Sequence, residues 1–233
     1  VQREFNLLGA TTITAGVTGQ QVSSHSILYS GDPNGDGENS ATNLAGYLQV
    51  DKKLMDRLML SAGVRYERFK VNADEQSEPV FRAGATYQLL QGTFLRASYG
   101  QGFRFPTIGE RYILTSVGSL HIYPNPELRP ETSVNIEGGI KQGFKFGGVT
   151  GYVDLTAFQQ DFDQYVEFTF GQWGEDRSPA NLLGFGFKSI NTGGARITGS
   201  EIAVAGKGKP GAVELTLLLG YTRKVKARLL RRR

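Results

Sequence analysis

The sequences YGQGFRFPTIGERY, residues 99–112, and NPELRPE, residues 125–131, frame the stretch that decides the fold of this chain. A segment of alternating apolar and polar residues precedes the stretch at 93–102, and another follows it at 131–142. Successive side chains of a β-strand point to opposite faces, so each segment is predicted to be a strand between an apolar and a wet environment. The framed stretch is then a long connection between two strands.

The same alternation recurs along the chain, most clearly at 57–69, where Leu60 and Val64 share one face and Arg65 and Glu67 the other. A helical period would spread these charges around the whole surface. We predict about nine strands, at residues 5–29, 42–51, 57–71, 79–90, 93–102, 131–142, 148–170, 187–206 and 212–222. The polar faces carry a charged set that consists of Arg65, Glu67, Arg96, Glu137, Asp154 and Glu201.

The predicted connections alternate in length. Short ones lie near 52–56, 90–92, 143–147 and 207–211, and longer polar ones lie at 30–41, 72–78, 104–129 and 171–186. Short turns at one end and long loops at the other are typical of transmembrane β-barrels. We therefore predict an all-β, antiparallel transmembrane barrel whose charged set faces the lumen. The alternatives are a soluble β-sandwich, in which the apolar faces pack on each other, and a small passive porin.

Composition excludes a helical membrane protein. None of the apolar runs among the 233 residues approaches the ~20 residues that a membrane helix needs. The 31 glycines and the 11% of aromatic residues suit strands and turns. The chain has no cysteine, which excludes disulfides and thiolate metal sites.

The net charge of +4 comes from the last residues of the chain. Seven of the 26 basic residues lie at 223–233, without an acidic residue among them, which leaves 19 basic against 22 acidic residues elsewhere. Such a tail can bind nucleic acid or an anionic membrane surface. We interpret it instead as a non-native or truncated end. The predicted division is thus a barrel domain at 1–222 and a basic tail at 223–233, with no nucleic-acid partner.

This arrangement resembles the C-terminal barrel portion of TonB-dependent outer-membrane receptors. The residues that carry the resemblance are Gly102, Phe103, Arg104, Pro106, Glu110, Asn125, Pro126, Leu128, Pro130 and Glu131. Further matches are GVRYE at 63–67, TAFQQDFDQYVEF at 156–168, and Asn191 followed by GSE at 199–201. The resemblance covers residues 5–222, and the order and spacing of the motifs carry it more than any one of them.

The resemblance implies part of a 22-stranded barrel, without the plug domain and TonB-contacting box of such receptors. It implies a non-enzymatic receptor in the outer membrane of a Gram-negative bacterium, in contact with outer-membrane lipid. The receptor would take up a scarce small-molecule nutrient with energy from the TonB-ExbB-ExbD system. A ferric siderophore or similar metal chelate is the commonest ligand of such receptors, and cobalamin, haem and glycans remain open.

Candidate ligand-binding residues cluster in two predicted loops. Arg104, Arg111, Tyr112, His121 and Tyr123 lie in or beside the longest one, and Trp173, the only tryptophan, lies in another. Converging Arg, Tyr and His side chains can hold an anionic or metal-chelate ligand. The alternative is that these side chains pack the loops against the barrel rim.

A possible calcium site lies in the first predicted loop. Its oxygen-bearing residues Asp32, Asn34, Asp36 and Glu38 follow the D-x-N-x-D-G pattern of an EF-hand loop. The twelfth position is Asn43 rather than the bidentate Glu, so a solvated polar turn is the alternative. The sequence GKGKPG at 206–211 matches a dinucleotide motif but precedes a strand, so we interpret it as a turn. Neither pattern predicts another cofactor.

Overall fold

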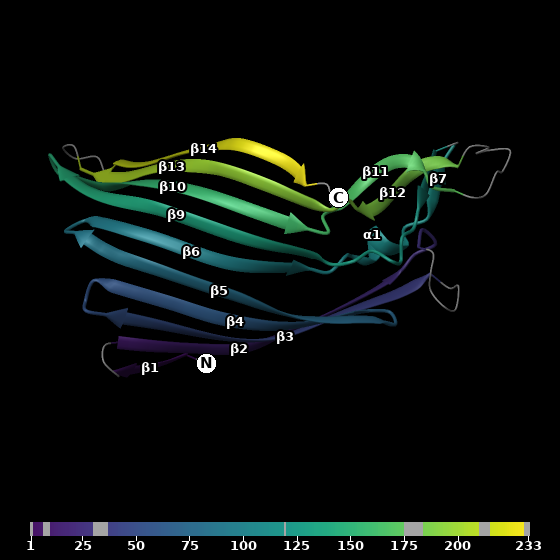
Figure 1. The fold of residues 1–233 in the computed structure, drawn as a ribbon, viewed down its shortest axis with the longest axis horizontal. Helices are drawn as coiled ribbons and strands as arrows, with labels where there is room; N and C mark the ends of the chain where they lie inside the picture. Colours follow the sequence, from purple (N-terminus) through teal and green to yellow (C-terminus); the bar gives the residue numbers. More distant parts are fainter. Residues whose placement is uncertain are drawn as a thin grey trace.

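The computed structural model describes residues 2–6, 10–29, 37–118, 120–174, 184–209 and 215–230. Ten antiparallel strands form one large sheet in the order β1-β2-β3-β4-β5-β6-β9-β10-β13-β14 (Figure 1). Its strands are β1 (Gln2–Asn6), β2 (Ala10–His25), β3 (Glu38–Leu54), β4 (Leu58–Val71), β5 (Asp74–Leu90), β6 (Thr93–Arg104), β9 (Glu131–Phe146), β10 (Val149–Asp163), β13 (Gly194–Gly208) and β14 (Leu215–Leu230). The predicted all-β antiparallel class is confirmed.

A second, smaller sheet lies beyond one end of the large sheet, where the long connections gather (Figure 1). We call this the loop end, the opposite end the turn end, and the smaller sheet the external sheet. The external sheet has the order β11-β12-β8-β7, with β7 (Thr115–Val117), β8 (Leu120–Tyr123), β11 (Val166–Gln172) and β12 (Phe185–Asn191). Strands β8 and β12 are parallel and come from different connections, so the external sheet joins them.

The predicted strand 5–29 was wrong as a single element, because β1 and β2 occupy that region. Two others, 148–170 and 187–206, were also wrong as single elements. Gln164 has a φ of 56° and Gly193 a φ of 98°, in the left-handed region that interrupts a strand. Each predicted strand is divided there into one strand of the large sheet and one of the external sheet. The two chain segments stay hydrogen-bonded to each other at the break. The Tyr165 amide donates to the Gly193 carbonyl at 2.9 Å, and the Thr192 amide donates to the Tyr165 carbonyl at 2.8 Å.

Several boundaries differ from the prediction, since β3 runs over Glu38–Leu54 rather than 42–51 and β9 continues to Phe146, and two differences are larger. The predicted loop at 72–78 is a tight turn after Val71, and residues 74–78 belong to β5, paired with β4. This segment is polar because the hairpin extends into water, and the Arg68 and Glu75 side chains bridge it at 2.7 Å. At the other boundary, β14 does not end at Thr222 but continues to Leu230, with its backbone paired to β13.

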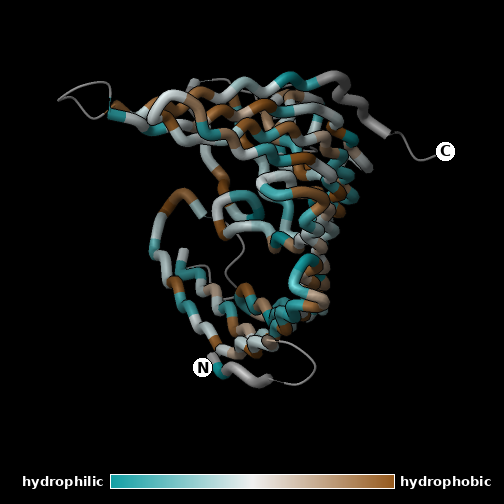
Figure 2. Tube along the Cα trace, turned by 90° about the vertical axis from the view of Figure 1, so that its left-hand side faces the viewer, coloured by the Kyte–Doolittle hydropathy of each residue, from teal (hydrophilic) through white to brown (hydrophobic). Residues whose placement is uncertain are grey.

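The large sheet is an arc rather than a closed ring. Figure 2, which looks along the strands from the turn end, shows it curving from the N-terminal strands to the C-terminal ones with one side open. No helix among the described residues has the length and apolar content to cross a bilayer.

One face of the arc carries a continuous apolar row. Cross-strand register places eight side chains side by side on consecutive strands from β3 to β14, which are Leu54, Leu58, Tyr87, Leu95, Ile140, Leu155, Ile202 and Tyr221. They are not buried by protein, since Leu155 is 46% exposed and Tyr221 64% exposed. We call the surface that bears this row the apolar face.

The opposite face is polar and more enclosed. In β4 the apolar positions from Leu60 to Tyr66 are exposed, while the alternate positions, Arg65 and Glu67 among them, are half-buried. This reverses the pattern of a water-soluble sheet, which places its apolar side chains inside. A soluble β-sandwich would cover the apolar face with a second sheet, and no such layer is present in the described ranges. Hydrocarbon is the medium that fits this face.

The small protein core lies at the loop end. It consists of Val71, Phe105, Ile108 and Tyr112, with Phe69 and Phe103 packed against it. Val71 and Phe69 come from the polar face of β4, so the chain after β6 folds onto that face. The core therefore holds the longest connection against the inside of the sheet.

Val64→Arg tests the assignment of the two faces. Val64 lies on the apolar face between Leu48 and Phe81, so a guanidinium there is expected to cost about 2–4 kcal/mol near the bilayer midplane. We expect a reduced yield of heat-modifiable barrel in outer-membrane fractions. The matched control is Ser61→Arg, whose side chain points to the other face beside Asp51. Equal assembly of the two variants would contradict the assignment.

Candidate functional site

The connection after β6 begins with a short helix, α1 (Ile108–Tyr112). Thr107 caps it, because its hydroxyl accepts from the Glu110 amide at 3.2 Å while the Glu110 carboxylate accepts from the Thr107 amide at 2.8 Å. Ile108 and Tyr112, four residues apart, point the same way and are buried in the core. The preceding Pro106 is fully buried. The sequence FPTIGERY thus folds as a capped turn that anchors the loop.

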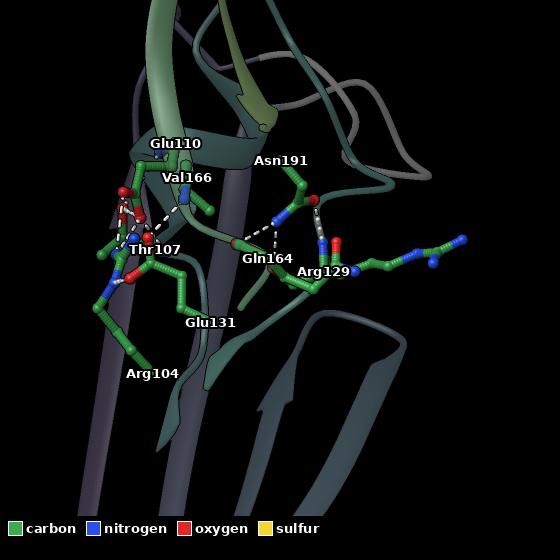
Figure 3. A network of polar contacts seen from close by, with 8 residues as sticks. All are labelled: Arg104, Thr107, Glu110, Arg129, Glu131, Gln164, Val166 and Asn191. Atoms are coloured by element: carbon green, nitrogen blue, oxygen red, sulfur yellow. Dashed lines mark hydrogen bonds and ion pairs between the residues drawn. The ribbon is translucent and has the colours of Figure 1, made fainter. Parts of the chain in front are cut away.

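Arg104 is the centre of an ion-pair network at the rim of the sheet (Figure 3). Its Nη1 donates to both Glu110 carboxylate oxygens at 2.9 Å, and its Nε donates to Oε2 of Glu131 at 2.5 Å. The other Glu131 oxygen accepts from the Val166 amide at 2.5 Å. Through these charge-assisted bonds, Arg104 and Glu131 join β6, α1, β9 and β11.

Asn191 forms a second junction beside the first (Figure 3). Its Nδ2 donates to the carbonyls of Arg129 at 3.0 Å and Gln164 at 2.8 Å, and its Oδ1 accepts from the Arg129 amide at 2.9 Å. Both amide protons and the oxygen are therefore used. Because Gln164 is the residue at which β10 gives way to β11, Asn191 fixes the external sheet to the segment before β9. We call the two junctions together the rim network.

Arg111 is buried inside the loop, with 3% of its surface exposed. Its Nε donates to the Pro126 carbonyl at 3.0 Å, and it forms an ion pair with Asp74. Its guanidinium also lies 5.5 Å from the Phe105 ring centroid and 5.4 Å from that of Tyr112. Arg111 thus links α1 to the second half of the loop and to the β4–β5 hairpin.

The predicted motif residues therefore have structural roles at the rim. The Asn125 side chain donates to the Ser189 carbonyl at 2.9 Å, Leu128 is 4% exposed, and Pro130 is buried. Among the predicted ligand-binding residues, Arg104, Arg111 and Tyr112 are engaged with the loop itself. A direct ligand contact by any of the three stays a prediction.

His121, Tyr123 and Trp173 are brought together on one face of the external sheet. Register aligns Gly171, Gly186 and His121 across β11, β12 and β8, and the His121 and Tyr123 rings stack with centroids 6.0 Å apart. The two glycines make this packing possible. A Cβ on Gly171 would lie 2.7 Å from the Trp173 ring, and one on Gly186 would lie 2.8 Å from the Tyr123 ring.

Two polar atoms of this cluster are buried without a hydrogen-bond partner in the described part of the chain, His121 Nε2 and Trp173 Nε1. Buried ring nitrogens are normally paired, so each needs an explanation. We call His121, Tyr123 and Trp173 the aromatic cluster. Sequence reasoning grouped His121 with Tyr123 in the longest loop but placed Trp173 in another loop. The glycines at 171 and 186, in strands otherwise rich in Phe, were the available signal.

The charged set of the sequence analysis lies on the face opposite the apolar row. Arg96 Nη2 donates to Asp154 at 2.8 Å and to Thr156 at 2.5 Å, and it crosses the intervening strand at Gly139, where a Cβ would lie 3.2 Å from Arg96 Nε. Arg65 pairs with Glu67, and Glu201 accepts from Thr222 at 3.2 Å. Glu137 lies two residues from Gly139 and shares this face. That these residues line a lumen stays a prediction.

The predicted calcium site cannot be placed, because Asp32, Asn34 and Asp36 lie outside the described residues. Glu38 begins β3, and its carboxylate lies 3.6 Å from His25 Nδ1. Within the described ranges, His, Asp and Glu side chains form no group of three or more that could hold a metal ion. The calcium site therefore remains a prediction.

Glu131→Gln tests the rim network. The amide nitrogen of Gln would face either Arg104 or the Val166 amide, both of which are donors, so we expect a loss of about 1–3 kcal/mol from the closed loop. Faster hydrogen exchange at the Val166 amide and faster proteolysis within 105–130 would report this loss. The control is Glu127→Gln, an exposed position of the same loop. Identical exchange in both variants would show that the network is dispensable.

The pKa of Glu110 gives the network a pH dependence. Burial pushes this pKa up, but the hydrogen bonds from Arg104 and Thr107 and the Arg104 charge outweigh burial and hold it below 4.5. A lowered folded pKa means that the stabilisation is present above the unfolded pKa and is lost as pH falls through the folded one. Protection of the Thr107 amide is expected to fall once the pH drops below the ordinary titration range of a Glu carboxyl. Glu110→Gln should remove that dependence, and a pH response unchanged by it would refute the assignment.

Comparison with known proteins agrees with the antiparallel barrel fold described above. The family model described as "TonB dependent receptor-like, beta-barrel" matches residues 2–230. The chain is 28% identical over 121 residues to hemoglobin and hemoglobin-haptoglobin-binding protein A of Haemophilus influenzae, which is 52% of this chain and 11% of that protein. It is 29% identical over 136 residues to the hemin receptor of Yersinia enterocolitica, which is 51% of this chain and 19% of that protein.

Solved structures show the same fold. The hemophore receptor HasR of Serratia marcescens, in complex with its hemophore HasA and heme, superposes with a TM-score of 0.78 at 17% identity, over 97% of this chain and 40% of that one. The siderophore receptor PirA of Pseudomonas aeruginosa superposes with a TM-score of 0.71 at 18% identity, over 96% and 41%. The chain thus spans less than half of each receptor. It belongs to the TonB-dependent receptor family, within the β-barrel of such receptors.

Proposed function

We propose that the protein is an outer-membrane receptor of a Gram-negative bacterium that takes up an iron compound with energy from the TonB-ExbB-ExbD system. The observation that carries the proposal is the combination of an uncovered apolar face with a rim network built from the family motif. The first suits a wall in contact with outer-membrane lipid. The rim network suits a barrel opening at the loop end, over which the external sheet is held in a defined position. The role is transport, not enzymatic catalysis.

Haem is the iron compound that we propose as the ligand. The curated relatives that share 28–29% identity over half of the chain carry hemin or hemoglobin in their names. The resemblance to siderophore receptors is at 18% identity and concerns the fold. A ferric siderophore, the commonest ligand of such receptors, is thus the second candidate.

The aromatic cluster supports haem on chemical grounds. Imidazole is a common axial ligand of haem iron, and a metal centre would satisfy the unpaired Nε2 of His121. Tyr123 and Trp173 on the same face offer flat apolar surface to a planar macrocycle. In this proposal His121 ligates the iron, the two aromatic side chains pack against the ring, and the rim network keeps the external sheet over the mouth.

A passive porin is the remaining alternative, and it differs in energy coupling. Diffusion through a porin continues without TonB, whereas uptake by the proposed receptor stops. Haemin-dependent growth of an iron-starved strain that carries this protein as its haem receptor should therefore vanish when TonB is deleted. Undiminished growth of the TonB deletion strain would favour the porin.

His121→Ala tests the ligand. We expect haemin affinity of the purified receptor to fall about tenfold or more, which corresponds to ~1.4 kcal/mol, and the Soret band of bound haemin to shift as the axial ligand is lost. The matched control is His25→Ala, whose imidazole lies beside Glu38 at the end of β2. Equal haemin binding by both variants would overturn the assignment of His121. Saturable binding of a ferric siderophore without haemin binding would overturn haem as the ligand.

A further inference from the structure

A pocket lies at the loop end of the sheet, between the wall and the connection that follows β6. Its volume is about 370 Å³, which is in the range of small-molecule sites. Strands β2, β3 and β4 contribute one side, and the segment from Phe105 to Gly109 contributes the other. No member of the aromatic cluster lines this pocket, so the proposed uptake of an iron compound leaves it unexplained.

Strand register places the wall side of the pocket on the polar face. Asn43 pairs with Gln20 on β2 and with Phe69 on β4, and all three residues line the pocket. Asn43 lies eleven residues from Leu54, a member of the apolar row on the same strand. Odd spacing puts two side chains on opposite faces of a strand. The pocket therefore opens on the side of the wall that hydrocarbon does not cover.

The small protein core supplies the apolar surface of the pocket. The rings of Phe69 and Phe105 stack with centroids 5.8 Å apart and planes 6° from parallel. Val71 and Ile108 belong to the same core, and all four side chains line the pocket. Aromatic rings gain from stacked or edge-to-face contact with one another, beyond the burial of their area. This surface therefore favours an aromatic occupant.

The lining of the pocket is uncharged. None of the residues that form it, all within the described ranges, is Asp, Glu, Lys, Arg or His. An ionised group that leaves water for a site without a partner charge loses far more than uncharged contacts return. The pocket therefore selects against phosphate and carboxylate groups and in favour of a neutral ligand.

One hydrogen-bond acceptor in the lining lacks a partner. Asn43 Oδ1 is buried and accepts no hydrogen bond in the described part of the chain. Buried amide oxygens normally accept at least one, so this atom needs an explanation. The last torsion of an Asn side chain is soft, and a turn about it presents Oδ1 to the pocket that Asn43 lines. A ligand with an N–H or O–H group would supply the missing donor.

We propose that this pocket binds a neutral aromatic compound that carries an N–H or O–H donor. Its ring packs against the Phe69 and Phe105 side chains, and its donor bonds to Asn43 Oδ1. Three features select this occupant, namely the aromatic surface, the absence of charge in the lining and the unpaired acceptor. The compound contacts β3 and α1 at once, so it holds the longest connection against the sheet. The proposal does not depend on which iron compound the receptor takes up.

The test compares two probes of the same shape, indole and benzothiophene, on the full receptor in lipid nanodiscs. Indole has an N–H group where benzothiophene has a sulfur atom, so only indole can donate to Asn43. With retention by empty nanodiscs subtracted, we expect indole to bind about tenfold more tightly. Bound indole should also slow hydrogen exchange at the Arg111 and Ile113 amides, which bond to the Thr107 and Gly109 carbonyls. Absence of saturable indole binding would overturn the proposal.

Two variants locate the site. Gly109→Leu fills the pocket, because Gly109 lines it and a Cβ there would meet no atom within 4 Å. This variant should lose both probes. Asn43→Leu keeps the side-chain volume and removes the acceptor, so indole should then bind no better than benzothiophene. The matched control is Gly100→Leu, on the polar face of β6, where a Cβ also meets no atom within 4 Å. The control should bind both probes like the parent protein.

Assembly is measured separately by the heat-modifiable migration of each variant, and the comparison of the two probes on the parent protein needs no variant. Equal loss of indole in Gly109→Leu and Gly100→Leu, or full binding by both, would overturn the pocket as the site. A preference for indole that survives Asn43→Leu would overturn the assignment of the acceptor. Either failure in an assembled receptor leaves the proposed function standing, because TonB-dependent growth on haemin is measured without the probes.

Discussion

An apolar face without a protein layer on it is the constraint on which the structure depends. A row of eight apolar side chains crosses eight strands, and the described chain provides nothing to cover it. Such a surface is stable only against hydrocarbon, and hydrocarbon in turn tolerates no unpaired backbone amide. Antiparallel pairing on both sides meets that demand for the large-sheet strands from β3 to β13, which have 12 to 17 residues. The length of the strands and the alternation of their residues therefore have a common cause.

At the rim of the sheet, strand pairing ends and side chains provide the hydrogen bonds that the backbone needs. Past Arg104 and before Glu131 the backbone leaves the strand pairing, so its polar groups need other partners. The rim network supplies them, since Glu131 accepts from the Val166 amide and Asn191 pairs with Arg129 and Gln164. The charged groups of Arg104, Glu110 and Glu131 are tolerated here because each has a hydrogen-bonding partner and the site borders water. The family motif is thus largely a device for ending strands and fixing loops.

Local periodicity explains why most of the large sheet could be predicted from the sequence. Where a strand lies between hydrocarbon and a polar interior, its alternation is strong, as in β4, β6 and β9. Above the membrane both faces meet water, so residues 74–78 of β5 look like a loop although they are paired. The break at Gln164 was also missed, because a left-handed non-glycine residue has no clear sequence signal. What the structure shows at this break is a tertiary hydrogen bond from Asn191 to the Gln164 carbonyl.

The candidate site was harder to predict than the wall because its members meet through long-range pairing. His121 lies some fifty residues from Trp173, and only the parallel contact between β8 and β12 brings their strands into one sheet. No local pattern encodes such a contact. Glycine shapes both the candidate site and the sheet, because it lacks a Cβ at positions where space is needed. At Gly171 and Gly186 a missing Cβ admits aromatic rings from the same sheet, and at Gly206 and Gly208 it leaves a groove on the apolar face between Phe144 and Leu217. The same absence of a side chain therefore gives a packed cluster where aromatic neighbours reach over it, and a groove where they do not.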